Sequence, residues 1–296
     1  MKHAFLIMAY NNWGQLRKLI SLLDDSRNSI YVHVDAKSID FDRAKFNGIV
    51  QNASLYFTPR MKVSWGGSNQ IECELLLLKE ALQSNCDYYH LLSGMDLPLH
   101  NMDYIDAFFH RYNGKEFVHF TELGETVTPQ TFERISIWYP LQNLLGRYAA
   151  PFNRFSCLAE PIFGINRLRK CSSLIFGRGA NWFSITRDFA HYVVDVWPKY
   201  KYMFSCSFCA DEIFLQTILL NSPYAMNIYH PQPDDRYESI MRLIDWKRGG
   251  PYIFKKEDFE DLVTSPMLFA RKFDQREDNV IITKLVMYLQ NTKNDR

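Results

Sequence analysis

The amino-terminal part of the chain alternates apolar runs of strand length with a helical pattern, and this alternation limits the possible folds. His3–Ala9 is one such apolar run and Ser29–Val34 is another. Between them, leucine and isoleucine recur at helical spacing over residues 16–23. A strand, a helix and a strand of this length form a right-handed βαβ unit whose strands pair in parallel. The sequence therefore predicts an α/β fold with a mixed, mostly parallel sheet flanked by helices.

The same signals continue to residue 98. Leu55–Thr58 is a candidate third strand, Ser68–Gln83 is a strongly apolar helix, and Tyr88–Leu92 is a buried strand. The last of these strands ends in a glycine turn, Ser93–Pro98, which carries one acid. Phe117–Phe120 is a further candidate strand in a less regular second half.

Three polar side chains follow the ends of these predicted strands. Tyr10 follows the first strand, Asp35 follows the second, and Asp96 lies in the glycine turn. Ligands of open α/β sheets bind beyond the carboxyl ends of the strands, so we expect a nucleotide site there, with Asp35 binding ribose hydroxyls or a base edge. The sequence contains neither a GxGxxG fingerprint nor a Walker loop. This argues against dinucleotide oxidoreductases and P-loop NTPases.

Composition narrows the remaining classes. A chain of 296 residues can form one large α/β domain or two small ones, and its net charge of +1 gives no electrostatic case for nucleic-acid binding. No apolar run approaches the roughly 18 residues of a membrane span, and the amino terminus has no signal-peptide pattern. Six scattered cysteines, with Cys206 and Cys209 as a lone CxxC, favour free thiols in a reducing cytoplasm over a zinc or redox site.

An acidic pair, Asp211 and Glu212, stands in front of an apolar run in Ser207–Asn221. The spacing predicts a core-packed helix that begins at the two acids. Free backbone N–H groups and the helix dipole keep a first-turn carboxylate ionised, so Glu212 is a candidate general base. The alternative is that Asp211 caps the helix and Glu212 has no further role.

Asp40 and Asp42 form a DxD sequence of the kind that holds a metal-bound nucleotide sugar. The pair lies in a polar loop rather than after a core strand, which favours an ordinary solvated loop. If it did bind a divalent ion, the protein would be a nucleotidyltransferase or a related metal enzyme.

The stretch Leu141–Arg178 is both basic and aromatic. Such a stretch is typical of a surface that binds an anionic membrane or an acidic acceptor. The alternative is an irregular segment whose aromatic side chains pack in the core and whose arginines are solvated. Its basic residues are Arg147, Arg154, Arg167, Arg169, Lys170 and Arg178 against Glu160 alone, and its aromatic residues include Tyr148, Phe152, Phe155, Phe163 and Phe176.

Seven motifs follow one another in a fixed order over residues 3–274. They are VHVDAKS (Val32–Ser38), VSWGGSNQIECELLLL (Val63–Leu78), YYHLLSGMDLPL (Tyr88–Leu99), GANWFSIT (Gly179–Thr186), ADEIFLQTIL (Ala210–Leu219), RLIDW (Arg242–Trp246) and LFARKF (Leu268–Phe273). In this order they resemble the core-2/I-branching β-1,6-N-acetylglucosaminyltransferase family, which also includes peptide O-xylosyltransferases. Each motif alone is weak, and the seven in register are specific.

The resemblance implies a GT-A-like glycosyltransferase fold, a UDP-sugar donor, and inversion at the sugar carbon without a metal or other cofactor. We expect a single domain over residues 1–296, with a nucleotide-binding half (1–110) and an acceptor and catalytic half (111–296). Animal members are Golgi membrane proteins with a stem and luminal disulfides. Because the sequence shows neither a stem nor an anchor, we expect a bacterial, cytoplasmic member, with peripheral contact at the inner face of the plasma membrane as a further hypothesis.

The resemblance also assigns the catalytic chemistry. It makes Glu212 the catalytic base. It assigns binding of the donor diphosphate to Lys272, in the Phe-Ala-Arg-Lys-Phe motif. A second diphosphate arginine is expected about two dozen residues earlier, where Arg248 is the best match and Arg242 the alternative. Asp211, beside the base, is expected on the acceptor side.

The remaining roles concern the donor and acceptor pockets. Asp35 resembles the family's uridine-binding acid, and Asp96 lies in the turn that the family places near the donor sugar. Ala9 and Tyr10, at the end of the first strand, complete the expected donor site. Trp182 matches an aromatic position beside the acceptor.

The transferred sugar is open within this family. UDP-GlcNAc is the first expectation and UDP-xylose the second, with a glycan or lipid-linked oligosaccharide as acceptor. The alternative outside the family's chemistry is a non-catalytic carbohydrate-binding protein, which would keep the aromatic pocket without needing Glu212 and Lys272.

Overall fold

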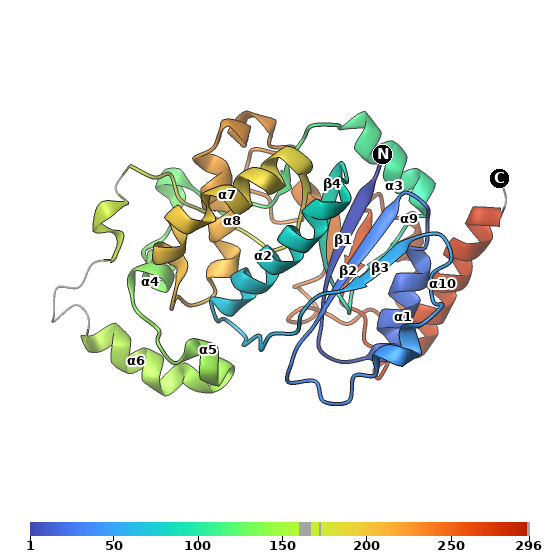
Figure 1. The fold of residues 1–296 in the computed structure, drawn as a ribbon, viewed down its shortest axis with the longest axis horizontal. Coiled ribbons are helices and arrows are strands. Elements are labelled where there is room, and N and C mark those ends of the chain that lie inside the picture. Colours follow the sequence, from blue (N-terminus) through green and yellow to red (C-terminus); the bar gives the residue numbers. More distant parts are fainter. Residues whose placement is uncertain (160–166, 172, 295–296) are drawn as a thin grey trace.

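A six-stranded mixed sheet lies at the centre of the computed structural model, which describes residues 1–159, 167–171 and 173–294. The strand order is β3-β2-β1-β4-β9-β6, with the first four strands parallel and β9 antiparallel to both of its neighbours. The predicted mixed, mostly parallel α/β fold is confirmed (Figure 1). The strands are β1 (His3–Ala9), β2 (Asn28–Val34), β3 (Ser54–Phe57), β4 (Tyr88–Ser93), β6 (Phe117–Val118) and β9 (Phe183–Thr186).

The inner strands are almost entirely buried because helices cover both faces of the sheet. Ala4 to Ile7 of β1 are fully buried, which is typical of a parallel strand between two helical layers. All four strands predicted before residue 100 are confirmed to within one residue at each end. Phe117–Phe120 is confirmed only in part, since the strand ends at Val118.

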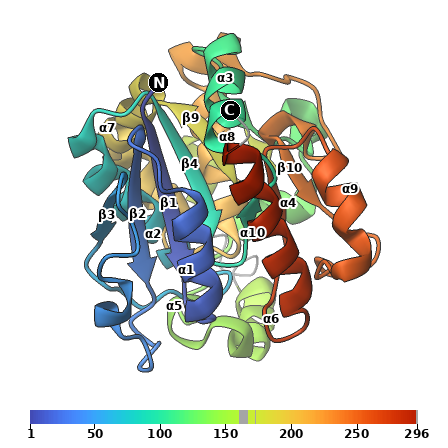
Figure 2. The same ribbon diagram turned by 90° about the vertical axis from the view of Figure 1, so that its right-hand side faces the viewer.

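Two helical layers enclose the sheet (Figures 1 and 2). One layer consists of α2, α7 and α8, and the other of α1, α3, α9 and α10. The helices of each layer share one hydrophobic cluster with the strands. The helices are α1 (Trp13–Leu22), α2 (Asn69–Ala81), α3 (Met102–Arg111), α7 (Arg187–Phe204), α8 (Phe214–Leu220), α9 (Phe259–Thr264) and α10 (Asn279–Asn294). The sequence pattern did not predict α3 or α10.

The two predicted halves of the chain share the central sheet. β6 and β9 lie after residue 110, yet β9 pairs with β4 through Tyr88 opposite Thr186 and His90 opposite Ser184. The division at residue 110 remains a prediction, but it does not coincide with a boundary of the sheet.

Two small sheets bring distant segments to the central one. A three-stranded sheet has the order β10-β11-β5, and a two-stranded sheet joins β7 to β8. The first carries the RLIDW and LFARKF motifs to the turn after β4, since Phe269 pairs with Pro98. The strands are β5 (Leu97–Pro98), β7 (Glu122–Leu123), β8 (Gly177–Arg178), β10 (Arg242–Ile244) and β11 (Phe269–Arg271).

The helix predicted to begin at the acidic pair is corrected by the structure. Asp211 and Glu212 lie in a separate 3₁₀ turn, Ala210–Glu212, and α8 begins only at Phe214. Ile213 has φ −128°, which is not a helical value, and its side chain is fully buried in the core. Glu212 is therefore outside the first turn of the α-helix, and the dipole argument for its ionisation does not hold.

The described helices of the basic aromatic stretch lie largely apart from the central sheet (Figure 1). It follows α4 (Pro129–Ser136) and contains α5 (Gln142–Leu145) and α6 (Ala150–Ala159). Glu160 and Phe163 lie outside the described residues. Phe176 is buried in the core, as the second alternative predicts, whereas Tyr148, Phe152 and Phe155 are exposed. Binding of a membrane or an acceptor by this stretch remains a prediction. No described helix combines the length and the apolar character needed to cross a bilayer.

Candidate active site

The carboxyl ends of β1, β2 and β4 meet at one rim of the sheet. The backbone N–H of Asp35 donates to the carbonyl of Ala9 at 2.9 Å, which joins the residue after β2 to the end of β1. The N–H of Gly94 donates to the carbonyl of Met8, also at 2.9 Å, and joins the turn after β4 to the same strand. Ala9, Tyr10, Asp35 and the turn that holds Asp96 are therefore neighbours, as the predicted nucleotide site requires.

Asp35 is buried at this rim and its carboxylate is held by the next turn. Oδ1 accepts from the backbone N–H of Lys37 at 2.8 Å, and the Lys37 ammonium lies 3.5 Å from Oδ2. A carboxylate fixed in this way keeps lone pairs for further donors, which is the property needed to bind ribose hydroxyls. Its role in binding uridine remains a prediction.

Asp96, Arg271 and Trp182 form a stack beside the same turn. Asp96 accepts from the backbone N–H and the hydroxyl of Ser93, at 2.9 and 2.8 Å. Nη1 of Arg271 lies 3.6 Å from Asp96 Oδ1, and the guanidinium lies 4.1 Å from the centre of the Trp182 ring. Trp182, predicted beside the acceptor, is thereby linked to the predicted donor acid through a cation.

Arg271 is a site residue that the sequence reasoning missed. Its side chain is 15% exposed, and its Nε and Nη1 atoms have no hydrogen-bond partner among the described residues. Unsatisfied donors on a charged group are costly to bury, so this guanidinium is suited to receive an anion. The signal was in the LFARKF motif, where Arg271 directly precedes Lys272, but only the lysine was assigned a role.

Lys272 is half-buried next to this arginine. Burial lowers the pKa of Lys272, and the neighbouring charge of Arg271 lowers it further. The following residue ties the segment to the rim, because the N–H of Phe273 donates to the carbonyl of Met95 at 2.9 Å. Two adjacent cations thus lie beside the Asp96 turn, where a bound polyanion would relieve their mutual repulsion.

Arg248 and Arg242 differ in accessibility. Arg248 is nearly half exposed, stacks over Tyr252, and forms ion pairs with Asp245 at 2.5 Å and Asp258 at 2.6 Å. A diphosphate would have to compete with these two carboxylates. Arg242 is almost fully buried and donates to the carbonyl of Ile240, so it is poorly placed to reach a ligand. Arg248 is the more accessible of the two, and the choice between them remains a prediction.

Glu212 is held by two arginines at one of its oxygens. Nη1 of Arg134 donates to Oε2 at 2.7 Å, and Nε of Arg178 lies 3.6 Å from the same atom. No residue of the described chain hydrogen-bonds Oε1, and the side chain is 38% exposed. The backbone N–H of Gly179 donates to the Glu212 carbonyl at 2.9 Å, which joins this turn to the segment that carries Trp182. The two arginines therefore form ion pairs with Oε2, and Oε1 is left without a hydrogen-bond partner among the described residues.

Asp211 points into the protein rather than towards an open acceptor pocket. Its Oδ2 accepts from Gln70 at 2.7 Å, while its Oδ1 and both oxygens of Glu74 are buried without a hydrogen-bond partner in the described structure. Burial, and then the charge of Glu212, raises the pKa of Asp211 to about 7. Burial also raises the pKa of Glu74, and the charge of Asp211 adds to this effect. These contacts favour a supporting role for Asp211 over direct contact with an acceptor.

The two acids of the DxD sequence have local structural partners. Asp40 accepts from the indole N–H of Trp13 at 2.8 Å, and Asp42 accepts from the backbone N–H of Ala44 at 3.0 Å. These contacts agree with an ordinary loop. In the part of the chain that the structure describes, no group of three or more His, Cys, Asp or Glu residues is arranged to hold a metal ion.

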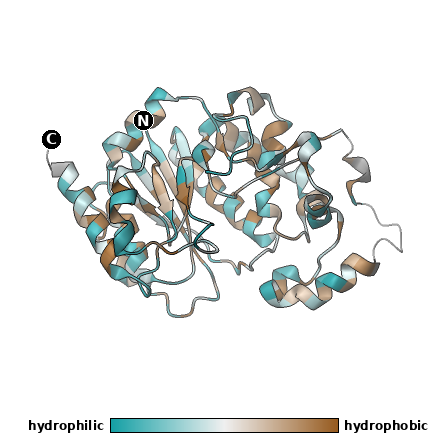
Figure 3. Cartoon of the chain, turned by 180° about the vertical axis from the view of Figure 1, so that it is seen from behind, coloured by the Kyte–Doolittle hydropathy of each residue, from teal (hydrophilic) through white to brown (hydrophobic). Residues whose placement is uncertain are grey.

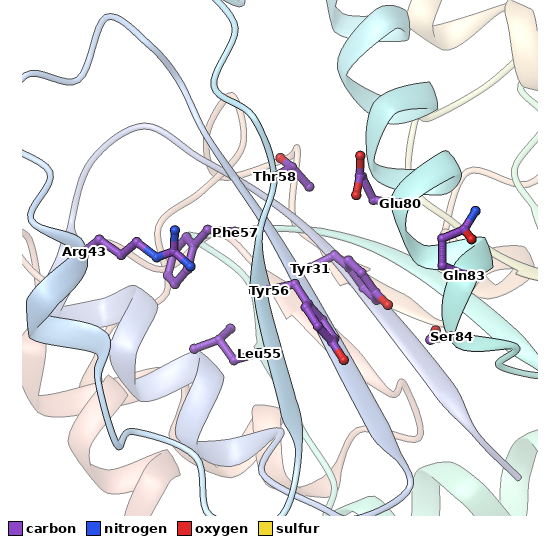
Figure 4. Close-up of a pocket in the computed structure, with 9 residues that line it drawn as sticks. All are labelled: Tyr31, Arg43, Leu55, Tyr56, Phe57, Thr58, Glu80, Gln83 and Ser84. Atoms are coloured by element: carbon purple, nitrogen blue, oxygen red, sulfur yellow. The ribbon is translucent and has the colours of Figure 1, made fainter.

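A pocket at the free edge of β3 is separate from this site (Figure 4). It is lined by the stacked rings of Tyr31 and Tyr56, by Arg43, and by Glu80 and Gln83 near the end of α2. None of the predicted site residues lines it. The pocket is therefore no part of the candidate active site.

The chain is similar to several known proteins. A family model described as Core-2/I-Branching enzyme matches residues 3–263. Curated relatives include "Xylosyltransferase 1" of Homo sapiens, 24% identical over 315 residues that cover 97% of this chain, and "Xylosyltransferase 2" of Rattus norvegicus, 22% identical over 303 residues that cover 93%. The chain spans only about a third of their length, 30% and 32% respectively. The apo crystal structure of mouse Xyloside xylosyltransferase 1 matches 91% of this chain and 97% of its own, at 10% identity and a TM-score of 0.37.

Proposed function

The chain belongs to the Core-2/I-branching enzyme family, and we propose that it transfers a sugar from a UDP-sugar to a hydroxyl group of a glycan acceptor, with inversion at the sugar carbon. The observation that supports this best is the Glu212 carboxylate, which two arginines hold at Oε2 while Oε1 stays open. It lies on a turn that is bonded to the segment carrying Trp182, and Trp182 stacks on Arg271 beside Lys272.

In this proposal the reaction is a single displacement. Oε1 of Glu212 accepts the proton of the acceptor hydroxyl as its oxygen forms a bond to the anomeric carbon. The bond between that carbon and the UDP oxygen breaks at the same time, and the electron pair leaves with UDP. The negative charge that develops on the diphosphate is stabilised by Arg271 and Lys272, with Arg248 as the third candidate cation.

We further propose that the reaction needs no divalent metal. Asp96, the acid in the turn after β4, already accepts two hydrogen bonds from Ser93 and faces Arg271. A single, occupied carboxylate is a poor ligand set for magnesium or manganese, whereas the two adjacent cations match the charge of such an ion. Turnover should therefore survive excess EDTA, and complete inhibition that manganese reverses would contradict the metal-free proposal.

The donor is the least constrained part of the proposal. UDP-GlcNAc is the donor that the family resemblance favours. UDP-xylose is the second candidate, and the names of the curated relatives favour it. A panel of UDP-sugars, scored by thermal shift and by release of UDP, distinguishes the two. If no UDP-sugar binds or turns over, the transferase proposal fails, and binding without turnover would support the carbohydrate-binding alternative.

The role of Glu212 is tested by Glu212→Gln. We expect kcat to fall by about 10² to 10⁴, the usual contribution of a general base, while the affinity for UDP changes little. The matched control is Glu125→Gln, an exposed glutamate that should leave both quantities unchanged. A Glu212→Gln enzyme that keeps most of its turnover would refute the assignment.

A further inference from the structure

Helices α5 and α6 carry their apolar side chains on the outside. Five large apolar residues of this segment are between 52% and 78% exposed. Four of them are spaced by four, three and three residues, so they form one stripe along the helical surface. The five residues, which we call the outer face, are Leu144, Tyr148, Phe152, Phe155 and Leu158.

Two uncharged polar side chains of the same segment, those of Asn153 and Cys157, contact the protein instead. Nδ2 of Asn153 donates to Oε1 of Gln142 at 2.8 Å, and Sγ of Cys157 lies 3.7 Å from the hydroxyl of Tyr139. This orientation is the reverse of an ordinary surface helix, which hides its apolar stripe and exposes its polar one. In Figure 3, α5 and α6 (lower right) carry apolar residues although these helices stand away from the main body. A contiguous exposed apolar patch of this kind marks a contact surface.

The charge of the segment identifies the partner. Arg147 and Arg154 are exposed beside the outer face, and the described residues 137–158 contain no aspartate or glutamate. Exposed aromatic and aliphatic side chains flanked by arginines match the interface of an anionic lipid bilayer. An apolar protein partner would not require the uniform positive charge.

Helix α5 is connected to the turn that carries Glu212 through residues 64–70. The carbonyl of Asn143 accepts from the hydroxyl of Ser64 at 2.8 Å, and Nε2 of Gln142 donates to the carbonyl of Trp65 at 2.7 Å. Gln70, a few residues further along, binds Asp211. Docking through α5 and α6 would therefore hold Glu212 close to the membrane surface.

We propose that the outer face of α5 and α6 docks this protein on an anionic phospholipid bilayer and presents Glu212 to acceptor glycans carried on lipids. The docking is independent of catalysis, whereas the identity of the acceptor as a lipid-linked glycan rests on the proposed transferase function.

The test is co-sedimentation of the full chain with vesicles of phosphatidylcholine and phosphatidylglycerol. We expect binding at low salt that weakens at high salt and is lost with pure phosphatidylcholine. The double variant Phe152→Ser, Phe155→Ser should lower the partition coefficient at least tenfold, and Arg147→Gln about fivefold. The matched controls are Ile39→Ser and Met226→Ser, which change two exposed apolar residues outside the outer face. Both variants should bind like the parent.

Two results would overturn the proposal. One is binding to anionic vesicles that is absent or that the double variant does not change. The other is a concentration-dependent dimer, seen by sedimentation velocity, that the double variant abolishes, because the outer face would then bind a second copy. The double variant should still turn over the UDP-sugar with a soluble acceptor, and loss of transfer only to a vesicle-borne glycolipid would support the acceptor class. An inactive parent that binds vesicles would refute the transferase function while leaving the docking intact.

Discussion

Replacing Arg271 provides a direct test of how the protein stabilises a departing diphosphate. Arg271→Met keeps a side chain of similar length that can still pack on Trp182, but it removes the charge and the two unpartnered donors. Loss of one charged donor from a preorganised anion site costs about 3 kcal/mol in the transition state. We therefore expect kcat/KM to fall by about 10²-fold.

The assay is steady-state release of UDP in the presence of EDTA, together with calorimetric titration of UDP. Arg271→Lys should recover part of the loss, because it keeps the charge but not the planar fork of donors. The control is Arg111→Met, at an exposed arginine on the last turn of α3, which should behave like the parent. Thermal unfolding of each variant distinguishes lost chemistry from lost folding.

The reasoning fails if folded Arg271→Met keeps kcat/KM within about threefold of the parent. Lys272 and Arg248 would then carry the diphosphate charge without Arg271. Arg271 would be an internal partner of Asp96, whose carboxylate lies 3.6 Å away.

Three further predictions concern stability. Gly179→Ala should destabilise the fold by at least about 3 kcal/mol, because a Cβ there would lie 1.8 Å from the carbonyl oxygen of His119. A melting temperature within about 2 °C of the parent would contradict this. Glu74→Gln should raise the free energy of unfolding at pH 8 but not at pH 4: the raised pKa of Glu74 means that its contribution is present at low pH and is lost as the pH rises. Equal effects in urea titrations at both pH values would refute that explanation. Burial lowers the pKa of His33 to about 4, so the free energy of unfolding should fall as the pH drops from 6.5 to 4. His33→Gln should remove up to about 3 kcal/mol of that fall. Urea titrations at a series of pH values measure the difference.

Strands β1, β2 and β4 were predictable because each contains an apolar run that helical layers cover on both faces, whereas β3 is a short, partly exposed edge strand. The rim followed from the same pattern, since the ends of parallel strands fall on one side. Family motifs supplied what periodicity did not, because they assigned both Lys272 and Asp96 to the donor site. The pairing of Phe269 with Pro98, which brings these two segments together, is seen only in the structure.

The remaining features depend on contacts between residues that are far apart in the sequence. Arg134 is 78 residues from Glu212, and no local pattern connects the two. The break at Ile213 was hidden because a buried isoleucine fits a helical pattern whether or not its backbone is helical. The orientation of α6 was equally unreadable, because periodicity shows that a helix has an apolar stripe but not which way the stripe faces.

The ion pairs of Glu212 have a consequence for regiochemistry. A freely rotating carboxylate offers either oxygen, so several hydroxyl groups of a sugar ring could present their protons to it. Here Arg134 donates a hydrogen bond to Oε2 and Arg178 lies 3.6 Å from the same atom, so in the proposed reaction the proton is accepted at Oε1. In the proposed reaction, the hydroxyl that becomes the glycosidic linkage is then the one that the acceptor presents from that direction. Linkage selectivity would be a matter of approach angle, and weakening the Arg134 contact should produce mixed linkages before it abolishes transfer.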